Sequence, residues 1–366
     1  MTIEKNVLFV GPIPPPVHGQ SVAFYNAFKG LPCQKKYIIN QNVSGKSFFM
    51  TISCMCRAVF ELFFYLLFKR IDIVYITCSR SKRGSLFDVL VFWLSKAFGA
   101  KIINHIHGGD FKDFLESLNG AFRRFICWSY GRVDVFIVLL EPMKSEIFCF
   151  PKAQVEVVPN FYERSLEEIQ TKTKSKSIRL LYLGNIMKTK GILELLDAYR
   201  LLTKKHGNLI LNIAGEFLGD SIATQKDIRD AFLKRYRILK EGKRGEIHHL
   251  GVVLGRDKIN LLRDSDIFVL PTFYKSEAFP LSLIEAMRAG NVIVTTKHNY
   301  LPAVVSEKNG CLIDTVSPEA VEEAIAYFVD DRNEMTRIQK YNMRSAKKMY
   351  PLERYVERLT AIFENV

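Results

Sequence analysis

Short apolar runs separated by helical patterns fill the first half of the chain. Six of these runs predict buried strands, at residues 6–10, 37–40, 71–77, 101–105, 133–139 and 155–159. Strands that are apolar on both faces and alternate with helices are typical of a parallel sheet with helices on both sides. The first half therefore predicts a doubly wound parallel α/β domain.

The same pattern restarts after a polar stretch, residues 167–177, which indicates a surface segment near a domain boundary. Further strands are predicted at 178–183, 209–214, 247–250, 267–270 and 292–296, and helices at 191–204, 318–329, 333–348 and 352–365. The fold class is accordingly α/β, with two doubly wound, Rossmann-like domains at residues 1–165 and 166–348. Pro351 interrupts the last helical run, so residues 349–366 are expected to contain a terminal helix. Ligands are expected in a cleft lined by the carboxyl ends of both sheets.

Composition adds a preference for anionic partners. The chain of 366 residues is 48% hydrophobic, enough for two cores, and carries a net charge of +14. By count the excess is spread, with +8 in residues 1–160 and +6 in residues 161–366. Since no nucleic-acid-binding motif accompanies it, we rank a membrane surface or an anionic substrate first and expect no nucleic-acid partner.

Residues 47–68 are rich in Phe and Leu and approach the length of a membrane span. Arg57 and Glu61 fall in the middle, which favours an amphipathic helix buried in the first domain, with these two side chains paired. A spanning helix is the less favoured alternative. A helix lying partly in the membrane interface is the third, supported by the flanking Lys46, Lys69 and Arg70.

The cysteines point to a reducing compartment. Seven are scattered along the chain without zinc-binding spacing, so we expect buried, reduced thiols in a cytosolic protein. We expect no secretory signal, because residues 1–5 run straight into a predicted strand. Asp264 and Asp266 are more easily interpreted as the turn before a strand than as a metal clamp, so no obligatory metal is predicted.

The most informative segment is 276–287, SEAFPLSLIEAM. Glu277 lies in a loop after a predicted strand, Pro280 suits the first position of a helix, and Glu285 falls just over one turn into it. The free backbone N–H groups between the carboxylates would suit a phosphate. A sugar nucleotide needs this combination, although an acidic helix entry without function is the simpler alternative.

Three other loops follow predicted strands. Gly19 would allow close approach of a phosphate or sugar, or else belongs to a stiff proline-rich connection. His107 lies two residues after His105, on the same side if the strand persists, and either serves a sugar hydroxyl or is structural. Asp110 would cap the next helix. Lys190 precedes a helix start, where an ammonium and helix amides can hold a diphosphate, or else is merely solvated.

These segments together resemble the retaining GT-B glycosyltransferases, the group 1 or family 4 type that includes bacterial lipopolysaccharide, capsule and mannosyl transferases. The resemblance covers nearly the full length. Residues 276–287 match the family's Ser-Glu-Gly-Phe-Gly/Pro-Leu-x-x-Leu-Glu-Ala-Met pattern. Further similar segments, in family order, are 157–160, 183–184 with 190–191, 214–216 and 250–252.

The resemblance implies catalytic roles for three residues. Glu277 would contact the donor sugar and stabilise positive charge at its anomeric carbon. Lys190 would neutralise the departing diphosphate, and His107 would lie near the donor sugar. It also implies a GT-B fold, with an acceptor-side first domain, a nucleotide-sugar-binding second domain and a terminal helix that crosses back to the first.

The resemblance further implies the donor-binding set. Glu285 would bind the ribose hydroxyls, and Gly19 would approach the phosphates. The other implied contacts come from Asn185, Lys190 and the backbone of Phe279, Pro280, Leu281 and Ser282.

Several positions depart from the family pattern. Asn185 stands where most members carry an Arg beside the diphosphate, so Lys188 or Arg256 would have to supply the charge, or Asn185 would act by hydrogen bonding. Asn299 and Tyr300 replace two glycines. Other replacements are Ala278 for Gly, Val292 for Pro and Ala303 for Glu.

The predicted function is transfer of a sugar from a nucleoside diphosphate sugar, with UDP favoured over GDP, to an acceptor hydroxyl with retention. No cofactor is expected beyond this co-substrate. The acceptor is predicted to be a lipid-linked saccharide at the inner face of the plasma membrane. Two alternatives stay open: a nucleotide-sugar epimerase on the same fold, and a non-catalytic binding subunit of a polysaccharide-synthesis complex.

Overall fold

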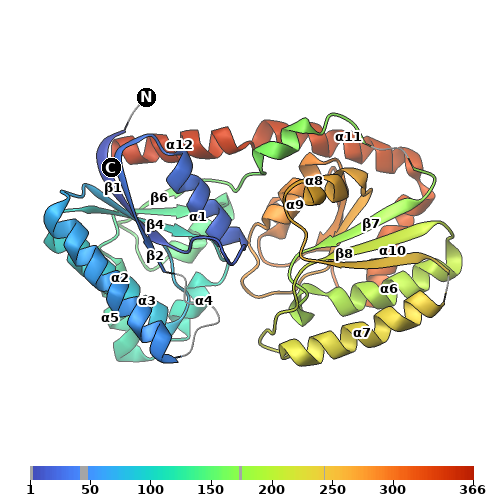
Figure 1. Ribbon diagram of the computed structural model, residues 1–366, viewed down its shortest axis with the longest axis horizontal. Helices are drawn as coiled ribbons and strands as arrows, with labels where there is room; N and C mark the ends of the chain where they lie inside the picture. Colours follow the sequence, from blue (N-terminus) through green and yellow to red (C-terminus); the bar gives the residue numbers. More distant parts are fainter. Residues whose placement is uncertain (1–2, 42–47, 173–174, 243) are drawn as a thin grey trace. The chain divides into compact units, whose positions relative to one another are not determined.

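The computed structural model describes residues 3–41, 48–172, 175–242 and 244–366. The chain divides into two compact units (Figure 1). The first comprises Met1–Asn160 and Glu353–Val366, and the second comprises Phe161–Leu352. Each contains a six-stranded parallel sheet with flanking helices, which confirms the prediction of a two-domain α/β fold.

The sheet of the first unit has the strand order β2-β1-β3-β4-β5-β6. Its strands are β1 (Ile3–Gly11), β2 (Cys33–Asn40), β3 (Ile73–Thr77), β4 (Lys101–Ile106), β5 (Val135–Val138) and β6 (Gln154–Val157). The chain places β2 on one side of β1 and β3 on the other, so the order of the strands reverses between β1 and β3. The loops that follow these two strands therefore part at this point, where ligands of doubly wound sheets bind.

Helices cover both faces of this sheet. Phe9 of β1 contacts the rings of Phe24 and Phe363, which places α1 (Gly19–Gly30) and α12 (Leu352–Asn365) on one face. The helices α2 (Phe48–Phe68), α3 (Lys82–Ala97) and α5 (Gly120–Tyr130) lie side by side on the other face (Figure 1). The short α4 (Phe111–Glu116) and the 3-10 segment η1 (Glu141–Ile147) complete the unit.

The sheet of the second unit has the order β12-β11-β10-β7-β8-β9. Its strands are β7 (Ile178–Leu183), β8 (Leu209–Ala214), β9 (Glu246–Gly251), β10 (Ile267–Leu270), β11 (Val292–Thr296) and β12 (Gly310–Ile313). Counted within the unit this is the order 3-2-1-4-5-6 of dinucleotide-binding folds, and its reversal lies between β7 and β10.

The helices of the second unit also form two layers. On one face α6 (Ile192–Lys205) contacts α7 (Gln225–Glu241) and α10 (Pro318–Asp330), and on the other α9 (Leu281–Arg288) contacts α11 (Arg332–Met349) (Figure 1). The remaining elements are α8 (Gly255–Asp264) and three 3-10 segments, η2 (Arg164–Glu168), η3 (Lys188–Lys190) and η4 (Leu301–Ala303).

Four strands, β7, β8, β10 and β11, and the helix α12 have the predicted bounds. The strand β12 was not predicted, because its four residues show no alternation and begin with a glycine. Gly310 (φ +155°) lies so close to β11 that a Cβ would be 1.8 Å from the carbonyl oxygen of Ile293. The helix α1 begins at Gly19, and His18 supplies its N-cap by accepting a hydrogen bond from the N–H of Ser21.

The helix α2 has the predicted ion pair, with Arg57 Nε 3.3 Å from Glu61 Oε1. Only one side of the helix is buried, through Ala58, Leu62 and Leu66, so the expectation of a buried helix is half right. No helix in the described part of the chain has the length and apolarity needed to cross a membrane. Residues 46 and 47 lie outside the described ranges.

Two sequence expectations need correction. All seven cysteines are free thiols, but only Cys78 is buried, and Cys56 is exposed. The polar stretch 167–177 is not wholly on the surface. Ile169 is buried, and Lys172 Nζ donates to the carbonyl of Arg263 (3.2 Å) and to Asn291 Oδ1 (2.9 Å), because the last carbonyls of α8 need a donor.

Candidate active site

In the second unit, Lys190 and Glu277 meet at the point where the sheet reverses. Lys190 ends the η3 segment after β7, and Glu277 lies in the loop between β10 and α9. Lys190 Nζ forms an ion pair with Glu277 Oε2, and their side chains are only 15% and 8% exposed. Thr272 Oγ1 donates to the same oxygen at 3.2 Å. Neither contact uses Glu277 Oε1, so that oxygen can serve another partner.

Close packing of the two loops explains the pairing. Gly191, with φ +71°, follows Lys190, and a Cβ there would lie 2.0 Å from the carbonyl oxygen of Pro271. The backbone N–H of Phe273 donates to the carbonyl of Thr189 at 2.8 Å. Only glycine satisfies both the left-handed backbone and this approach, so residue 191 fixes where the Lys190 ammonium lies.

The loop after β11 is hydrogen-bonded to the loop that carries Glu277. Asn299 adopts φ +46°, a conformation that Asn tolerates better than most residues. Its Nδ2 donates to the carbonyls of Lys275 (2.7 Å) and Glu277 (3.1 Å). His298 Nε2 donates to the carbonyl of Tyr274 at 2.9 Å. Asn299 replaces a glycine of the family pattern and therefore keeps the turn while adding two hydrogen bonds.

The helix α9 begins one residue later than predicted. Pro280 is the N-cap, with ψ 131°, and Leu281 is the first helical residue. The intrahelical bonds begin with Leu283, whose N–H donates to the carbonyl of Pro280 at 3.2 Å. The amides of Leu281 and Ser282 precede that bond and lie at the positive end of the helix. These are the amides suited to a phosphate group.

The side chain of Phe279 is not part of an open surface. It is 3% exposed and packs edge-on against Tyr350, with ring centroids 5.3 Å apart. The side chain is therefore closed to a ligand, and a donor contact by residue 279 stays a prediction for its backbone.

Glu285 is buried in an ion-pair cluster that the sequence did not predict. Lys258 Nζ of α8 lies 2.9 Å from Glu285 Oε1 and 2.7 Å from Glu163 Oε1. Burial raises the pKa of Glu285, and Lys258 opposes this shift. Burial also opposes the charge of Lys258, but the two carboxylates outweigh it and raise its pKa. In the sequence, the signal for this cluster was that Lys258 shares one helical side with Ile259 and Leu262, which are buried.

Asn185, which stands where the family pattern has an arginine, lies in the loop after β7. Its carbonyl accepts a hydrogen bond from Tyr182 Oη at 2.7 Å. Arg256 lies 3.6 Å from Glu168 and its side chain is 83% exposed. Lys188, the other candidate for the missing charge, begins the η3 segment two residues before Lys190.

In the first unit, Gly19 and His107 follow β1 and β4. Gly19 opens α1, and no atom lies within 4 Å of the place where its Cβ would be, so its backbone is accessible. His107 stacks on His105, with ring centroids 4.0 Å apart, as the predicted same-side placement requires. Tyr75 Oη lies 2.6 Å from His105 Nδ1 and fixes that ring.

His107 is a neutral imidazole near neutral pH. Burial, followed by the charges of Arg80 and His18, lowers its pKa to about 3. Its Nε2 is buried and has no hydrogen-bond partner among the described residues. A neutral ring with an unsatisfied nitrogen is suited to hydrogen bonding with a hydroxyl group rather than to binding an anion.

Arg80 is the residue of this unit that sequence reasoning missed. It follows β3, beside the point where the sheet reverses. Its guanidinium covers Gly108, where a Cβ would be 2.3 Å from Arg80 Cζ, and its Nε lies 2.6 Å from Asp110 Oδ1. Asp110 is thus an ion-pair partner and not the side-chain cap that was predicted. The signal was an arginine directly after a buried strand.

A buried carboxylate positions the loop that carries Arg80. Asp88 of α3 accepts hydrogen bonds from the N–H and Oγ of Ser79, both at 2.9 Å, and from Tyr130 Oη at 2.6 Å. Burial raises the pKa of Asp88 to about 6, although the three hydrogen bonds that it accepts lower the pKa.

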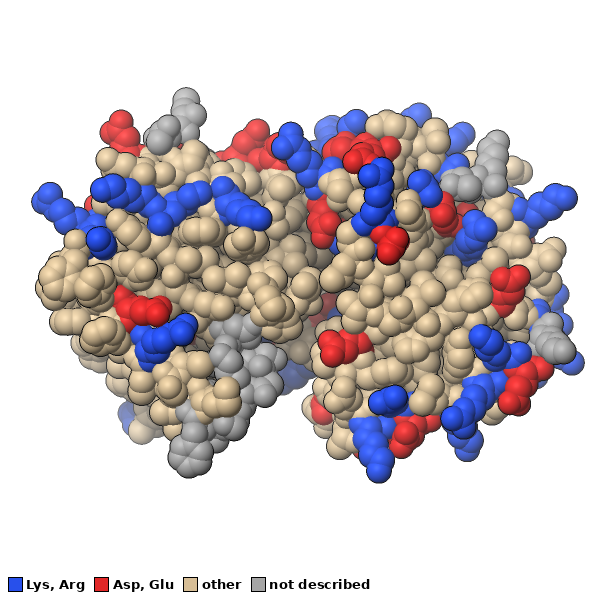
Figure 2. All heavy atoms as spheres, in the orientation of Figure 1, with Lys and Arg blue, Asp and Glu red and all other residues tan. Residues whose placement is uncertain are grey.

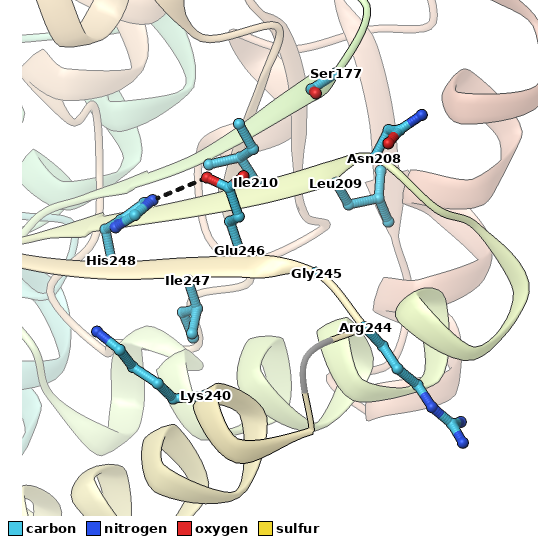
Figure 3. Close-up of a pocket in the computed structure, with 10 residues that line it drawn as sticks. All are labelled: Ser177, Asn208, Leu209, Ile210, Lys240, Arg244, Gly245, Glu246, Ile247 and His248. Atoms are coloured by element: carbon cyan, nitrogen blue, oxygen red, sulfur yellow. Dashed lines mark ion pairs between the residues drawn. The ribbon is translucent and has the colours of Figure 1, made fainter.

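Two hollows of the second unit lie at opposite sheet edges. One lies at the carboxyl ends of β8 and β9, with Gly215, Glu216, His249 and Val252 in its lining, beside the motifs 214–216 and 250–252. The other lies at the amino ends of the same strands, with Glu246 and His248 3.5 Å apart (Figure 3). Arg244 extends away from that pair (Figure 3). Parallel sheets bind ligands at the carboxyl ends of their strands, so the hollow at the amino ends is not a candidate for the donor site.

Residues 3–41, 48–172, 175–242 and 244–366 contain no cluster of three or more His, Cys, Asp or Glu side chains placed to hold a metal ion.

Comparison with solved structures identifies the class of fold. The UDP complex of HepE from Anabaena aligns with a TM-score of 0.74 over 99% of this chain and 100% of that one, at 14% identity. The two-domain fold is therefore that of the GT-B glycosyltransferases.

Comparison of sequences then identifies one domain. Residues 164–345 match the family Glycosyl transferases group 1, so this segment is a domain of that family. O-antigen chain mannosyltransferase B of Escherichia coli is 30% identical over 60% of this chain and 55% of its own length. The uncharacterized glycosyltransferase YqgM of Bacillus subtilis is 24% identical over 63% and 62%. The chain thus spans less than two thirds of these relatives' lengths.

Proposed function

We propose that this protein is a retaining glycosyltransferase of family 4 that transfers a hexosyl or N-acetylhexosaminyl group from a nucleoside diphosphate sugar to a hydroxyl of a lipid-linked saccharide. The observation that carries the proposal is the Lys190–Glu277 pair, which lies at the reversal point of the second sheet. A fixed cation, a carboxylate and helix amides there match the groups of a sugar diphosphate.

The diphosphate would bind to the amides of Leu281 and Ser282 and to Lys190. An incoming phosphate oxygen competes with Glu277 for the ammonium of Lys190. Glu277 is then able to turn its negative charge toward the donor sugar. Charge separation of this kind stabilises a sugar cation and a departing diphosphate at the same time.

The bond that breaks joins the anomeric carbon to the diphosphate oxygen, and the bond that forms joins that carbon to the acceptor oxygen. The acceptor proton passes to the departing phosphate on the same face of the sugar. This route requires no protein nucleophile and gives retention. His107, neutral and with an unpaired Nε2, would hydrogen-bond a sugar hydroxyl, and Gly19 would approach a phosphate.

The nucleotide is proposed to be a uridine nucleotide, because several similar solved structures contain UDP or UDP-glucose. Glu285 would bind the ribose hydroxyls, with Lys258 holding its carboxylate in place. The hollow beside Gly215 and Val252 lies at the same sheet edge and would take the base. Asn185 would contribute a hydrogen bond to the diphosphate.

The acceptor is proposed from relatives that act in surface-polysaccharide synthesis. These include the O-antigen mannosyltransferase and a Campylobacter jejuni enzyme named for a diphospho-undecaprenol substrate, which is 32% identical over 24% of this chain. We accordingly place the reaction at the cytoplasmic face of the plasma membrane.

The test is nucleotide release from a panel of UDP- and GDP-sugars, with and without polyprenyl-diphosphate saccharides. Acceptor-dependent release that is lost in Glu277→Ala is expected, and the anomeric configuration of the product should equal that of the donor. Turnover without an acceptor would indicate an epimerase instead. Binding of nucleotide sugar without release for any pair would favour a non-catalytic subunit.

A further inference from the structure

We propose that the exposed faces of α2, α3 and α5 form a docking surface for the interfacial layer of an anionic lipid bilayer. This aromatic face is defined by Phe60, Phe63, Phe64, Leu67, Phe68, Leu86, Leu90, Trp93, Phe125 and Trp128, which are 37–71% exposed. The inference concerns the first unit alone and does not depend on the donor site of the second.

The helix α2 is apolar on two opposite sides. Ala58, Leu62 and Leu66 are buried against the unit, as the inward side of an amphipathic helix should be. Phe60, Phe64 and Leu67, spaced i, i+4 and i+7, form a second apolar stripe that is 71%, 45% and 48% exposed. The second stripe is apolar surface that the described residues leave exposed, so it can be covered by an apolar environment outside the unit.

Neighbouring helices extend the face, and Phe63 and Phe98 contact one another at 5.8 Å between α2 and the end of α3. Trp93 of α3 and Trp128 of α5 lie 4.6 Å apart. The three helices run side by side in Figure 1, and in Figure 2 the visible surface over α2 is tan apart from one red and one blue group. The apolar side chains thus form one surface and are not scattered singly.

The polar groups of the face are those of a membrane interface. Trp93 Nε1 donates to Ser129 Oγ at 3.2 Å, and the guanidinium carbon of Arg132 lies 3.8 Å from the ring centroids of both Trp93 and Trp128. Tryptophan and arginine with apolar bodies and polar ends favour the headgroup layer over the hydrocarbon core.

Charge selects an anionic partner. The three helices carry six basic residues, Arg57, Lys82, Arg83, Lys96, Arg123 and Arg124, and two acidic ones. Two of the bases are paired, Arg57 with Glu61 and Lys96 with Asp134, and Asp88 is buried, so the three helices keep an excess of basic over acidic groups. Lys69 and Arg70 follow α2 directly. A second copy of this chain would set these cations against one another, whereas anionic headgroups would neutralise them.

The experiment uses the two tryptophans, because the chain contains only Trp93 and Trp128 and both lie on the aromatic face. The full chain is mixed with phosphatidylglycerol-containing vesicles or with phosphatidylcholine vesicles, and its emission and flotation are recorded. A blue shift and co-flotation are expected with the anionic vesicles, weakening as salt is raised.

The variant Phe60→Ser/Phe64→Ser/Leu67→Ser keeps both tryptophans and should reduce partitioning at least tenfold. The matched control Ile222→Ser/Ile238→Ser/Tyr327→Ser changes similarly exposed side chains of the second unit and should partition like the wild type. Because all six side chains are exposed, both variants should keep the wild-type melting temperature. Turnover with a water-soluble acceptor should also be unchanged.

Three outcomes would overturn the proposal. The first is no flotation and no emission shift with anionic vesicles. The second is equal partitioning by the triple variant. The third is a dimer of the wild-type chain that the triple variant abolishes, which would assign the face to a second copy.

Discussion

Lys190 and Glu277 form an ion pair although 87 positions separate them in the chain. Their side chains belong to loops that follow neighbouring strands, β7 and β10, and Gly191 allows those loops to pack closely. The pair places a cation and an anion next to the amides that begin α9, which is the arrangement that a leaving diphosphate and a sugar cation require.

Removing either partner should slow sugar transfer. In the proposed mechanism Lys190→Ala takes away the cation beside the leaving group and Glu277→Gln takes away the charge that faces the sugar, so kcat should fall about 10²–10³-fold in each. Lys297→Ala, which breaks the more exposed Lys297–Asp314 pair of the same unit, is the control and should keep full activity. A double variant no slower than the single ones would support action as a unit. Unchanged kcat in both single variants would remove the pair from the mechanism.

Gly191→Ala should damage both stability and activity. The new Cβ would lie 2.0 Å from the carbonyl oxygen of Pro271, and φ +71° strains any side chain. We expect a loss of more than about 1 kcal/mol in the free energy of unfolding, together with reduced kcat, because the loops must separate. Gly207→Ala, where no atom lies within 4 Å, should be nearly neutral. Equal behaviour of the two variants in urea unfolding would contradict the packing argument.

Lys258→Met should destabilise the second unit strongly. The carboxylate of Glu285, 5% exposed, would lose its buried partner, at a cost of about 3–5 kcal/mol in the free energy of unfolding. The double variant Lys258→Met/Glu285→Leu should recover most of that stability while nucleotide binding stays impaired. Urea unfolding and UDP titration would measure both effects. A single variant within about 1 kcal/mol of wild type would argue against the cluster.

His107 should stay uncharged through the working pH range. With a pKa of about 3 it is neutral above about pH 5, so it contributes no limb to the pH–rate profile near pH 6.5. In spectra of protein labelled at histidine Cε1, the signal missing from His107→Gln should not shift between pH 5 and 8. Added free histidine gives the reference titration. Movement of that signal across this range would show that the ring gains a proton.

Asp88 should make stability depend on pH. Its pKa is raised from 3.8 to about 6, so the folded state binds this proton more tightly than the unfolded chain. Its stabilising contribution is full below about pH 4 and is lost as pH rises through about 6. The loss amounts to at most about 3 kcal/mol.

The comparison with Asp88→Asn isolates that contribution. Relative to the variant, the wild type should lose unfolding free energy between pH 4 and 7. A difference between the two proteins that does not change with pH would exclude the linkage.

Local sequence patterns were sufficient to predict the bounds of four strands of the second unit, β7, β8, β10 and β11. Residues 178–183 and 267–270 are short apolar runs bounded by polar residues, and such runs are buried wherever a parallel sheet forms. The loops holding Lys190, Glu277 and His107 could be found in the same way, since they directly follow strands. The resemblance of residues 276–287 to a family motif pointed to the chemistry.

The sequence by itself determined the alternation of strands and helices, the two α/β domains and the loops that carry chemistry, because these depend on periodicity within a few residues. Only the tertiary structure decided the partners. Lys258 meets Glu285 across 27 positions, Arg80 covers Gly108, and the second stripe of α2 stays exposed. Such pairings depend on strand order and on which helix faces which sheet, and these are set by packing over the whole unit.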